Sequence, residues 1–428
     1  MKRKIGVLAA ATAAALILAG CSTGTPEEAG GKDITLWLMG GDTPDALRDY
    51  LKTEYADATG GTLTIEEQAW GDALAKLTTA LPDAENTPDV VEIGNTWSPT
   101  FTNAGAFTDL SDDYEALGGD KLLPSFVEVG EVDGANYALP YYFGSRYVFF
   151  RKDVWAAAGK EVPTTLTEFN ESAAALKTKG QSGFYIGGED WRNGVSWVFA
   201  NGGELAKKDG DTWKSSLSDP KTIEGLTQLQ SLFADASLAP VTEADSTPWV
   251  NINNNEGTGK PEAATIIAPG WAHWSIGDLA PDPADDTKTV ATWNDDVFGA
   301  FVLPGVDGGV APVFAGGSNI AISAASKNQT ASKDLLKIIF SEEYQTLLGE
   351  NGLGPANLDY ASALGDDQFA KALIASAAES KLTPAAQGWA AVEGAGLLEE
   401  FFGKVNAGGD IPALAEEYDA KIDELING

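Results

Sequence analysis

The chain of 428 residues is poor in the side chains that most often carry catalysis or bind metals. It has one cysteine, Cys21, one histidine, His273, and two methionines. A single cysteine forms no internal disulfide, and one Cys with one His excludes Cys/His zinc sites and Cys–His nucleophiles. A serine triad would depend on His273 alone, which we expect to be a packed or surface residue. We therefore predict no cofactor and no metal site.

Positive charge is also scarce. The chain has 28 Lys and Arg against 63 Asp and Glu, a net charge of −35. Because so acidic a surface repels phosphate backbones and anionic lipid, we expect no nucleic-acid partner and no peripheral membrane binding. The 43% hydrophobic and 21% charged contents are those of a folded protein, and the length suggests two or three domains. No Walker motif or complete dinucleotide fingerprint is present.

The N-terminus has the features of an export signal. Lys2, Arg3 and Lys4 precede an apolar run to Ala19, which is too short to span a bilayer as a mature helix. Leu18-Ala19-Gly20-Cys21 resembles the lipobox of bacterial lipoproteins, in which the cysteine is lipidated and the chain is cut before it. We predict a lipoprotein signal peptide over 1–20 and a flexible tether over 21–32. The protein would lie outside the cytoplasm and be anchored to the bacterial cell membrane by a lipid on Cys21.

From Asp33 onward the pattern alternates strands and helices. Strands flanking helices indicate an α/β fold with parallel sheets, whose ligands lie at the carboxyl ends of the strands. The polar stretches 239–260 and 280–296 are predicted to be irregular surface connections. Strands are expected at 34–38, 62–66, 89–93, 137–140, 145–151, 263–268, 297–303 and 319–322, and helices at 72–81, 153–159, 165–179, 335–340, 368–378, 397–402 and 411–425, with further helices after Pro44 and Pro220.

Exposed aromatic residues suggest a sugar site. Of twelve tryptophans, several stand at predicted element ends beside Asn, Asp, Gln or Gly. A pyranose ring stacks its C–H face on an indole, and its hydroxyls pair with amides and carboxylates. A single tryptophan is more often a core residue than a sugar contact, and a single polar neighbour is more often a turn residue than a ligand contact. The sugar-site prediction therefore depends on the whole set of residues together. The set is Trp70, Trp97, Trp191, Trp271 and Trp389, with Asp42, Gln68, Asn95, Asp190 and Asn319.

The chain resembles the family 1 extracellular solute-binding proteins of ABC importers, the sugar-binding lipoproteins that include maltose-binding protein. The likeness spans nearly the whole mature chain, and its segments are specific in their order and spacing. Two departures are Phe150-Arg151-Lys152, where the family usually has Tyr-Asn-Lys, and Thr165-Leu166, where it usually has Thr-Trp. The matching segments are 34–37, 87–91, 137–142, 149–155, 158–159, 162–169, 264–271, 301–305 and 316–322.

The resemblance implies a two-lobe periplasmic-binding-protein-like (type II) fold, with hinge-linked lobes that each contain a mixed, mostly parallel sheet. Lobe 1 would comprise 33–142 plus 298–357 and lobe 2 143–297 plus 358–428, with crossings near 140–145, 297 and 358. Ligand would bind between the lobes, and the closed protein would deliver it to the permease subunits. It implies a monomer without enzymatic activity. The implied ligand-binding residues are Gly41, Asp42, Gln68, Trp70, Asn95, Thr96, Trp97, Gly317 and Ser318 from lobe 1, with Tyr142, Asp190, Trp191, Trp271 and Trp389 from lobe 2.

Two alternatives stay open at this point. A secreted glycoside-active enzyme would also combine aromatics with carboxylates, although no acid and base pair stands out. The same fold could bind a non-sugar small molecule such as an amino acid or a chelated metal, and an amino-acid binder would usually need an arginine for the carboxylate. Arg146 and Arg192 are the only arginines near the predicted cleft. Five candidate tryptophans favour a disaccharide or short oligosaccharide over a single ring.

Overall fold

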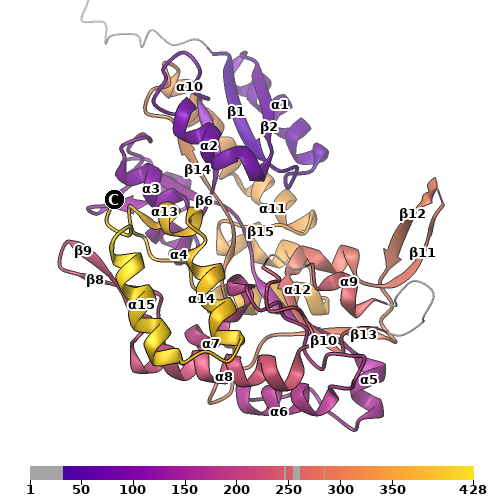
Figure 1. The fold of residues 1–428 in the computed structure, drawn as a ribbon. Coiled ribbons are helices and arrows are strands. Elements are labelled where there is room, and N and C mark those ends of the chain that lie inside the picture. Colours follow the sequence, from indigo (N-terminus) through magenta and orange to yellow (C-terminus); the bar gives the residue numbers. More distant parts are fainter. Residues whose placement is uncertain (1–31, 245–246, 254–260, 284) are drawn as a thin grey trace, which may run out of the picture.

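The computed structural model describes residues 32–244, 247–253, 261–283 and 285–428 of the chain. The predicted signal peptide, Cys21 and nearly all of the predicted tether lie outside the described residues. None of the helices in the described part of the chain has the length and apolar character needed to cross a bilayer. Two main sheets organise the fold (Figure 1).

The first sheet has six strands in the order β15-β6-β14-β3-β1-β2. Strand β1 is parallel to β2 and β3, as the opening strand–helix alternation predicts, whereas β14 runs antiparallel between β3 and β6. The first sheet is therefore mixed, but it is not mostly parallel as expected, because three of its five pairings are antiparallel. Its strands are β1 (Ile34–Met39), β2 (Leu63–Gln68), β3 (Val90–Gly94), β6 (Ala138–Gly144), β14 (Gly316–Ile322) and β15 (Gly354–Pro355).

Helices cover both faces of this sheet because successive strand residues point to opposite sides. Leu36 and Leu38 pack against one group of helices, while Val91 and Ile93 pack with α2 on the other face. Gly60, with a φ of 71°, ends α1 in the left-handed conformation that favours glycine. The helices of the first face are α1 (Asp45–Thr59), α10 (Gln329–Ile339) and α11 (Glu342–Glu350); α2 (Trp70–Ala80) and α3 (Ser98–Asn103) lie on the second.

The second sheet has three strands in the order β10-β7-β13, and both pairings are antiparallel. The prediction of a mostly parallel sheet is wrong for these strands; parallel neighbours occur here as isolated bridges such as Tyr185 with Ile266. The strands are β7 (Arg146–Arg151), β10 (Thr265–Pro269) and β13 (Phe298–Phe301), and the helices around them are α5 (Lys152–Ala157), α6 (Leu166–Leu176), α7 (Trp191–Ala200), α8 (Pro220–Ala236), α12 (Gln368–Ala378), α13 (Trp389–Gly394), α14 (Leu397–Asn406) and α15 (Ile411–Asp423).

One chain segment connects the two sheets directly. Strand β6 of the first sheet is followed, after the buried Ser145, by β7 of the second. Strand β13 pairs with β7, so residues 298–301, assigned above to lobe 1, lie in the second sheet. The strand pairing thus favours a crossing between β13 and β14, within 302–315. The division into lobes stays a proposal.

The stretch 280–296 was predicted to be irregular, and that prediction is wrong. The stretch forms most of a hairpin of β11 (Asp278–Asp282) and β12 (Asp285–Thr292), which projects from the body of the molecule (Figure 1). The many Asp and Pro residues hid this pattern, because an exposed hairpin has no buried face to impose alternation. A second hairpin, β8 (Ala206–Asp209) with β9 (Thr212–Ser215), was also not anticipated.

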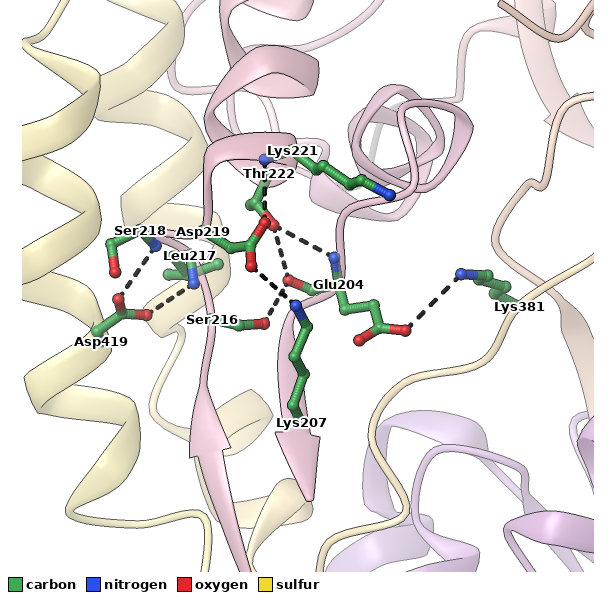
Figure 2. A network of polar contacts seen from close by, with 10 residues as sticks. All are labelled: Glu204, Lys207, Ser216, Leu217, Ser218, Asp219, Lys221, Thr222, Lys381 and Asp419. Atoms are coloured by element: carbon green, nitrogen blue, oxygen red, sulfur yellow. Dashed lines mark hydrogen bonds and ion pairs between the residues drawn. The ribbon is translucent and has the colours of Figure 1, made fainter. Parts of the chain in front are cut away.

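A polar network fixes the last long helix to the second sheet's helices (Figure 2). The Asp419 carboxylate on α15 accepts the backbone N–H groups of Leu217 (2.7 Å) and Ser218 (3.1 Å). Beside it, Asp219 caps α8 and pairs with Lys207 at 2.8 Å. Asp419 thus satisfies two donors just before α8, about 200 residues away in sequence.

We predict that Asp419→Ala lowers the free energy of unfolding by about 1–3 kcal/mol, because two backbone donors lose a charged acceptor. Urea unfolding followed by circular dichroism measures the change. Glu416→Ala, at an exposed position on the same helix, is the control and should shift stability by less than about 0.5 kcal/mol. Equal effects of the two substitutions would contradict the assigned role.

Candidate functional site

A cavity of about 550 Å³ is lined by residues from both sheets, and we call it the inter-sheet cavity. Its volume lies within the range of about 300–1,000 Å³ that is typical of small-molecule sites. Its lining residues are Asp42, Trp70, Gly94–Trp97, Tyr142–Arg146, Asp190, Arg192, Asn193, Trp249, Pro269–Trp271, Phe314–Gly317, Gly352, Leu353, Leu373 and Glu393.

The structure brings most of the predicted ligand-binding residues to this cavity. Those that line it are Asp42, Trp70, Asn95, Thr96, Trp97, Tyr142, Asp190, Trp271 and Gly317. Those that do not are Gly41, Gln68, Trp191, Ser318 and Trp389. The placement supports the first set as candidates, and the second set lies outside the lining of the cavity.

The Asp42 carboxylate organises the first wall. Its Oδ2 accepts hydrogen bonds from Trp70 Nε1 (3.0 Å) and Tyr142 Oη (2.9 Å). Asp42 follows a tight turn in which Gly40 has a φ of 62°, and a Cβ there would lie 2.2 Å from the indole of Trp70. Glycine is thus required both for the turn and for the close approach of the ring.

Trp70 packs against Trp97, with ring centroids 5.7 Å apart and planes inclined by 59°. Gly94 lies beneath both rings, since a Cβ there would meet Trp70 at 3.3 Å and Trp97 at 3.4 Å. Both rings are partly exposed and both line the cavity. The end of β3 therefore presents an aromatic corner to the cavity.

The second wall carries another aromatic pair. Trp249 on α9 (Trp249–Ile252) and Trp271 on the 3₁₀ helix η3 (Gly270–Ser275) have ring centroids 4.7 Å apart at 71°. Trp271 is 54% exposed, which is unusual for so large an apolar side chain. Each wall of the cavity thus offers two tryptophans.

The charged groups near Asp190 already have partners. Asp190 caps α7 and accepts from the backbone and side chain of Asn193, the latter at 2.7 Å. Arg146 donates to Asn193 Oδ1 (2.9 Å) and to the carbonyl of Phe314 (3.3 Å), and its guanidinium lies 4.7 Å from the centre of the Phe314 ring. Arg146 is therefore held by the protein rather than left for a ligand anion.

Glu393 connects the two walls. Its Oε2 accepts from Thr96 Oγ1 (3.3 Å) and lies 3.8 Å from Arg192, and its Oε1 accepts from Trp389 Nε1 (2.8 Å). Burial raises the pKa of this carboxyl, and Arg192 opposes that shift. Two further bonds join the same regions: Thr100 Oγ1 donates to the carbonyl of Gln387 (2.8 Å), and Asn95 Nδ2 donates to that of Ala315 (3.4 Å).

The predicted residues that miss the cavity support its walls or turns. Trp191 and Trp389 are almost fully buried, and their indole N–H groups donate to Glu399 and Glu393. Ser318 is buried behind Tyr142 and donates to its hydroxyl at 3.4 Å. Gln68 and Gly41 lie at the ends of strands without facing the cavity: Gln68 accepts from Lys76, and Gly41 forms the turn before Asp42. Asn319, another polar candidate for the sugar site, is buried, and its Nδ2 donates to the backbone carbonyl of Phe126.

Sequence reasoning missed Trp249 and Glu393. Trp249 fell within a stretch predicted to be irregular, where neither periodicity nor a strand end marked it. Glu393 was one of 63 carboxylates, but its spacing of four residues from Trp389 on one helix face was a usable signal.

Comparison with known proteins places the chain in a family. A sequence profile of the bacterial extracellular solute-binding proteins matches residues 51–377. The chain belongs to this family. The diacetylchitobiose binding protein DasA of Streptomyces coelicolor is 35% identical over 370 residues, which cover 85% of this solute-binding protein and 82% of DasA.

Solved structures show the same fold. The sugar-binding protein MalE from Xanthomonas citri superposes with a TM-score of 0.76 at 19% identity, covering 92% of this chain and 97% of MalE. A cyclo/maltodextrin-binding protein complexed with maltotetraose gives a TM-score of 0.73 at 19% identity, covering 93% and 98%. The two-lobe type II architecture inferred from the sequence is therefore confirmed as the fold class.

A buried acid lies behind the first wall of this solute-binding protein. Glu92 on β3 is fully buried, and its Oε2 accepts the N–H of Met39 at 2.8 Å, just before the turn that carries Asp42. Burial raises the pKa of Glu92 from 4.5 to about 7; Asp42 adds to the shift, and the Met39 N–H and the hydroxyls of Ser318 and Tyr142 oppose it.

We predict that this group makes stability depend on pH. Because folded Glu92 holds its proton more tightly than unfolded Glu92, its contribution is complete below pH 4.5 and is lost as the pH rises to about 7. The loss should be about 3 kcal/mol relative to Glu92→Gln, which cannot titrate. Urea unfolding from pH 4 to 8 measures both proteins. Asp57→Asn, at an exposed position on α1, is the control, and parallel stability curves for wild type and Glu92→Gln would contradict the prediction.

Proposed function

We propose that the protein is the lipid-anchored, sugar-capturing component of an ABC importer, which holds a disaccharide or short oligosaccharide in the inter-sheet cavity and delivers it to the permease. The observation that carries this proposal is the pair of tryptophans on each wall, Trp70 with Trp97 and Trp249 with Trp271. Two aromatic corners facing one cavity suit a ligand with apolar faces and a polar edge.

The polar groups between these corners suit hydroxyl and amide groups. Asp42 retains acceptor capacity on Oδ1, and Asn95 and Thr96 follow it along the first wall. Phe143, Leu353 and Leu373 add apolar surface to the lining. Micromolar binding requires about −8.2 kcal/mol, which stacked rings and a few aligned hydrogen bonds can supply.

The charge arrangement favours an uncharged ligand. Arg146 is held by Asn193 and Phe314, and Arg192 lies within 3.8 Å of both Glu393 and Glu399. Recruiting either arginine to a ligand carboxylate would first break these contacts. A neutral sugar needs no such exchange, so the sugar is favoured over an amino acid.

A relative that is 35% identical is named as a diacetylchitobiose binding protein, and this supports a narrower ligand class. We propose that this chain also binds a β-linked N-acetylglucosamine disaccharide. Such a ligand has two rings for the aromatic corners, two amides for the polar groups, and two methyls for the apolar surface of Phe143, Leu353 and Leu373. The disaccharide is also uncharged, which fits a cavity whose arginines are already held by groups of the protein.

Capture would proceed by closure of two lobes around the sugar. The contacts of Thr96 with Glu393 and of Thr100 with Gln387 join the two walls, so a sugar that touches both walls would favour the closed state. We propose that lobe 1 comprises 33–142 plus 316–357 and that lobe 2 comprises 143–301 plus 358–428. The second crossing then lies within 302–315. The binding step breaks no covalent bond, which separates this function from the glycosidase alternative.

We predict that Trp70→Ala raises the Kd for diacetylchitobiose about 30-fold, because it removes one stacking surface and one partner of Asp42. Isothermal titration calorimetry on a chain that starts after Cys21 measures the affinity. Trp37→Ala, outside the cavity, is the control and should keep the wild-type Kd within about twofold.

Chromatography of the incubated sugar separates the alternatives. Intact disaccharide supports binding without catalysis, and released monosaccharide would identify a glycosidase. Saturable binding of an amino acid with no sugar binding would contradict the sugar assignment.

We predict that Cys21→Ser releases the protein from the cell membrane, because lipid attachment at this position would provide the anchor. Fractionation followed by immunoblotting should move the protein from the membrane pellet to the soluble fraction. Mass spectrometry of the wild-type N-terminus tests the attachment itself. An unmodified Cys21 in membrane-bound protein would overturn the anchor.

A further inference from the structure

The short helix η3 has three distinct faces. In a 3₁₀ helix residues i and i+3 lie one above the other, so Gly270–Ser275 divides into three pairs. Ala272 is fully buried, and Ser275 is partly buried, with its backbone carbonyl accepting from Asn253 Nδ2 at 2.7 Å.

The pair formed by Gly270 and His273 lies against α12. The imidazole of His273 stacks on Phe369 with ring centroids 4.6 Å apart, and a Cβ on Gly270 would meet Leu373 at 3.6 Å. Two faces of η3 are thus used for packing. The third face carries Trp271 and Trp274.

Trp271 and Trp274 are the exposed face of η3. Trp271 is 54% exposed and lines the inter-sheet cavity, and Trp274 is 70% exposed and does not line it. Their attachment points are about 6 Å apart along the helix axis. The aromatic surface of the second wall therefore continues past the cavity by one helical turn.

Trp274 has a limited packing role. Its ring contacts the imidazole of His273, with the two ring centroids 4.1 Å apart. An indole with 70% of its surface exposed contributes little to a core and leaves a large apolar face in water. An indole has only two side-chain torsions, so it offers a large contact area at a small cost in conformational entropy.

We propose that Trp274 is an outer subsite that stacks a third sugar ring, so that the protein prefers chains of three or more β-linked N-acetylglucosamine units over the disaccharide. This proposal rests on the sugar-binding function argued above. In a β-linked chain the ring substituents are equatorial, so both faces of each ring present axial C–H groups. Successive rings can therefore stack on one wall even though the chain turns over at each linkage.

The distance between Trp271 and Trp274 fits this geometry. One turn of η3 separates the attachment points of the two indoles by about 6 Å, which is close to the length of one pyranose unit in a β-linked chain. A chain seated on Trp271 and leaving the cavity along η3 would place its next ring over Trp274. Because Trp274 does not line the inter-sheet cavity, a disaccharide held in the cavity would not need it.

Calorimetric titration of the chain starting after Cys21 with N-acetylglucosamine oligomers of two, three and four units tests the proposal. The trimer should bind wild type about tenfold more tightly than the dimer, the usual contribution of one aromatic contact. In Trp274→Ala this ratio should fall to within about twofold, while the dimer keeps its affinity. Trp274→Tyr, which retains an aromatic platform, should keep most of the gain. Trp271→Ala should weaken dimer and trimer together.

The outcomes separate this proposal from the function on which it rests. Dimer binding with no further gain for the trimer overturns the outer subsite and leaves the sugar-binding function standing. No binding of any oligomer overturns both. If Trp274→Ala changes no affinity but lowers uptake of the sugar by cells, the exposed face serves the permease and the outer subsite is overturned. Because Trp274 is so exposed, unchanged thermal unfolding of the variant is expected and checks its fold.

Discussion

The cavity depends on one extended segment that belongs to two sheets. Strands β6 and β7, residues 138–151, run from the first sheet into the second with the buried Ser145 between them. The chain cannot leave one sheet without entering the other, so the ends of both sheets are brought together. Tyr142 lies just before this junction and Arg146 just after it, and both line the cavity. The position of the site therefore follows from the backbone path, and the side chains then determine what binds there.

The site also shows how an acidic protein can bind a neutral ligand. Asp42, Asp190 and Glu393 all line the cavity, and each accepts hydrogen bonds from groups of the protein itself. Their charges are used to hold indoles, a helix end and a hydroxyl in position. The aromatic faces that they orient remain open to the cavity. Electrostatics here set the shape of the site, and the apolar rings provide the surface for recognition.

The sequence predicted the first wall better than the second. The ends of β1 and β3 are marked by periodicity and by glycine, so the amino-acid pattern alone was enough to place Asp42, Trp70 and Asn95. Trp191 and Trp389 carry the same local pattern of indole beside a polar residue, but they are buried. A tryptophan at a helix start can point inward or outward, and only tertiary packing decides.

Segments without a buried face were the hardest to predict. The hairpin of β11 and β12 was taken for an irregular connection because its exposed residues follow no alternation. Trp249 was missed for a related reason, since α9 has only four residues and shows no helical period. The fold class could be reached from the sequence because it depends on long strands and helices with clear apolar faces. The second wall is built from short elements whose conformation is imposed by their neighbours.

The contact of Asp419 with Leu217 and Ser218 has a consequence for biosynthesis. Helix α15 ends at Asp423, five residues before the end of the chain, yet it packs into the same core as α8 and α14. That core cannot be completed until α15 has been synthesised, about 200 residues after the start of α8, and pairing over such a separation is slow to form. The core that contains α8, α14 and α15 is therefore completed only when α15 has docked, so this helix is one of the last elements to be fixed in place.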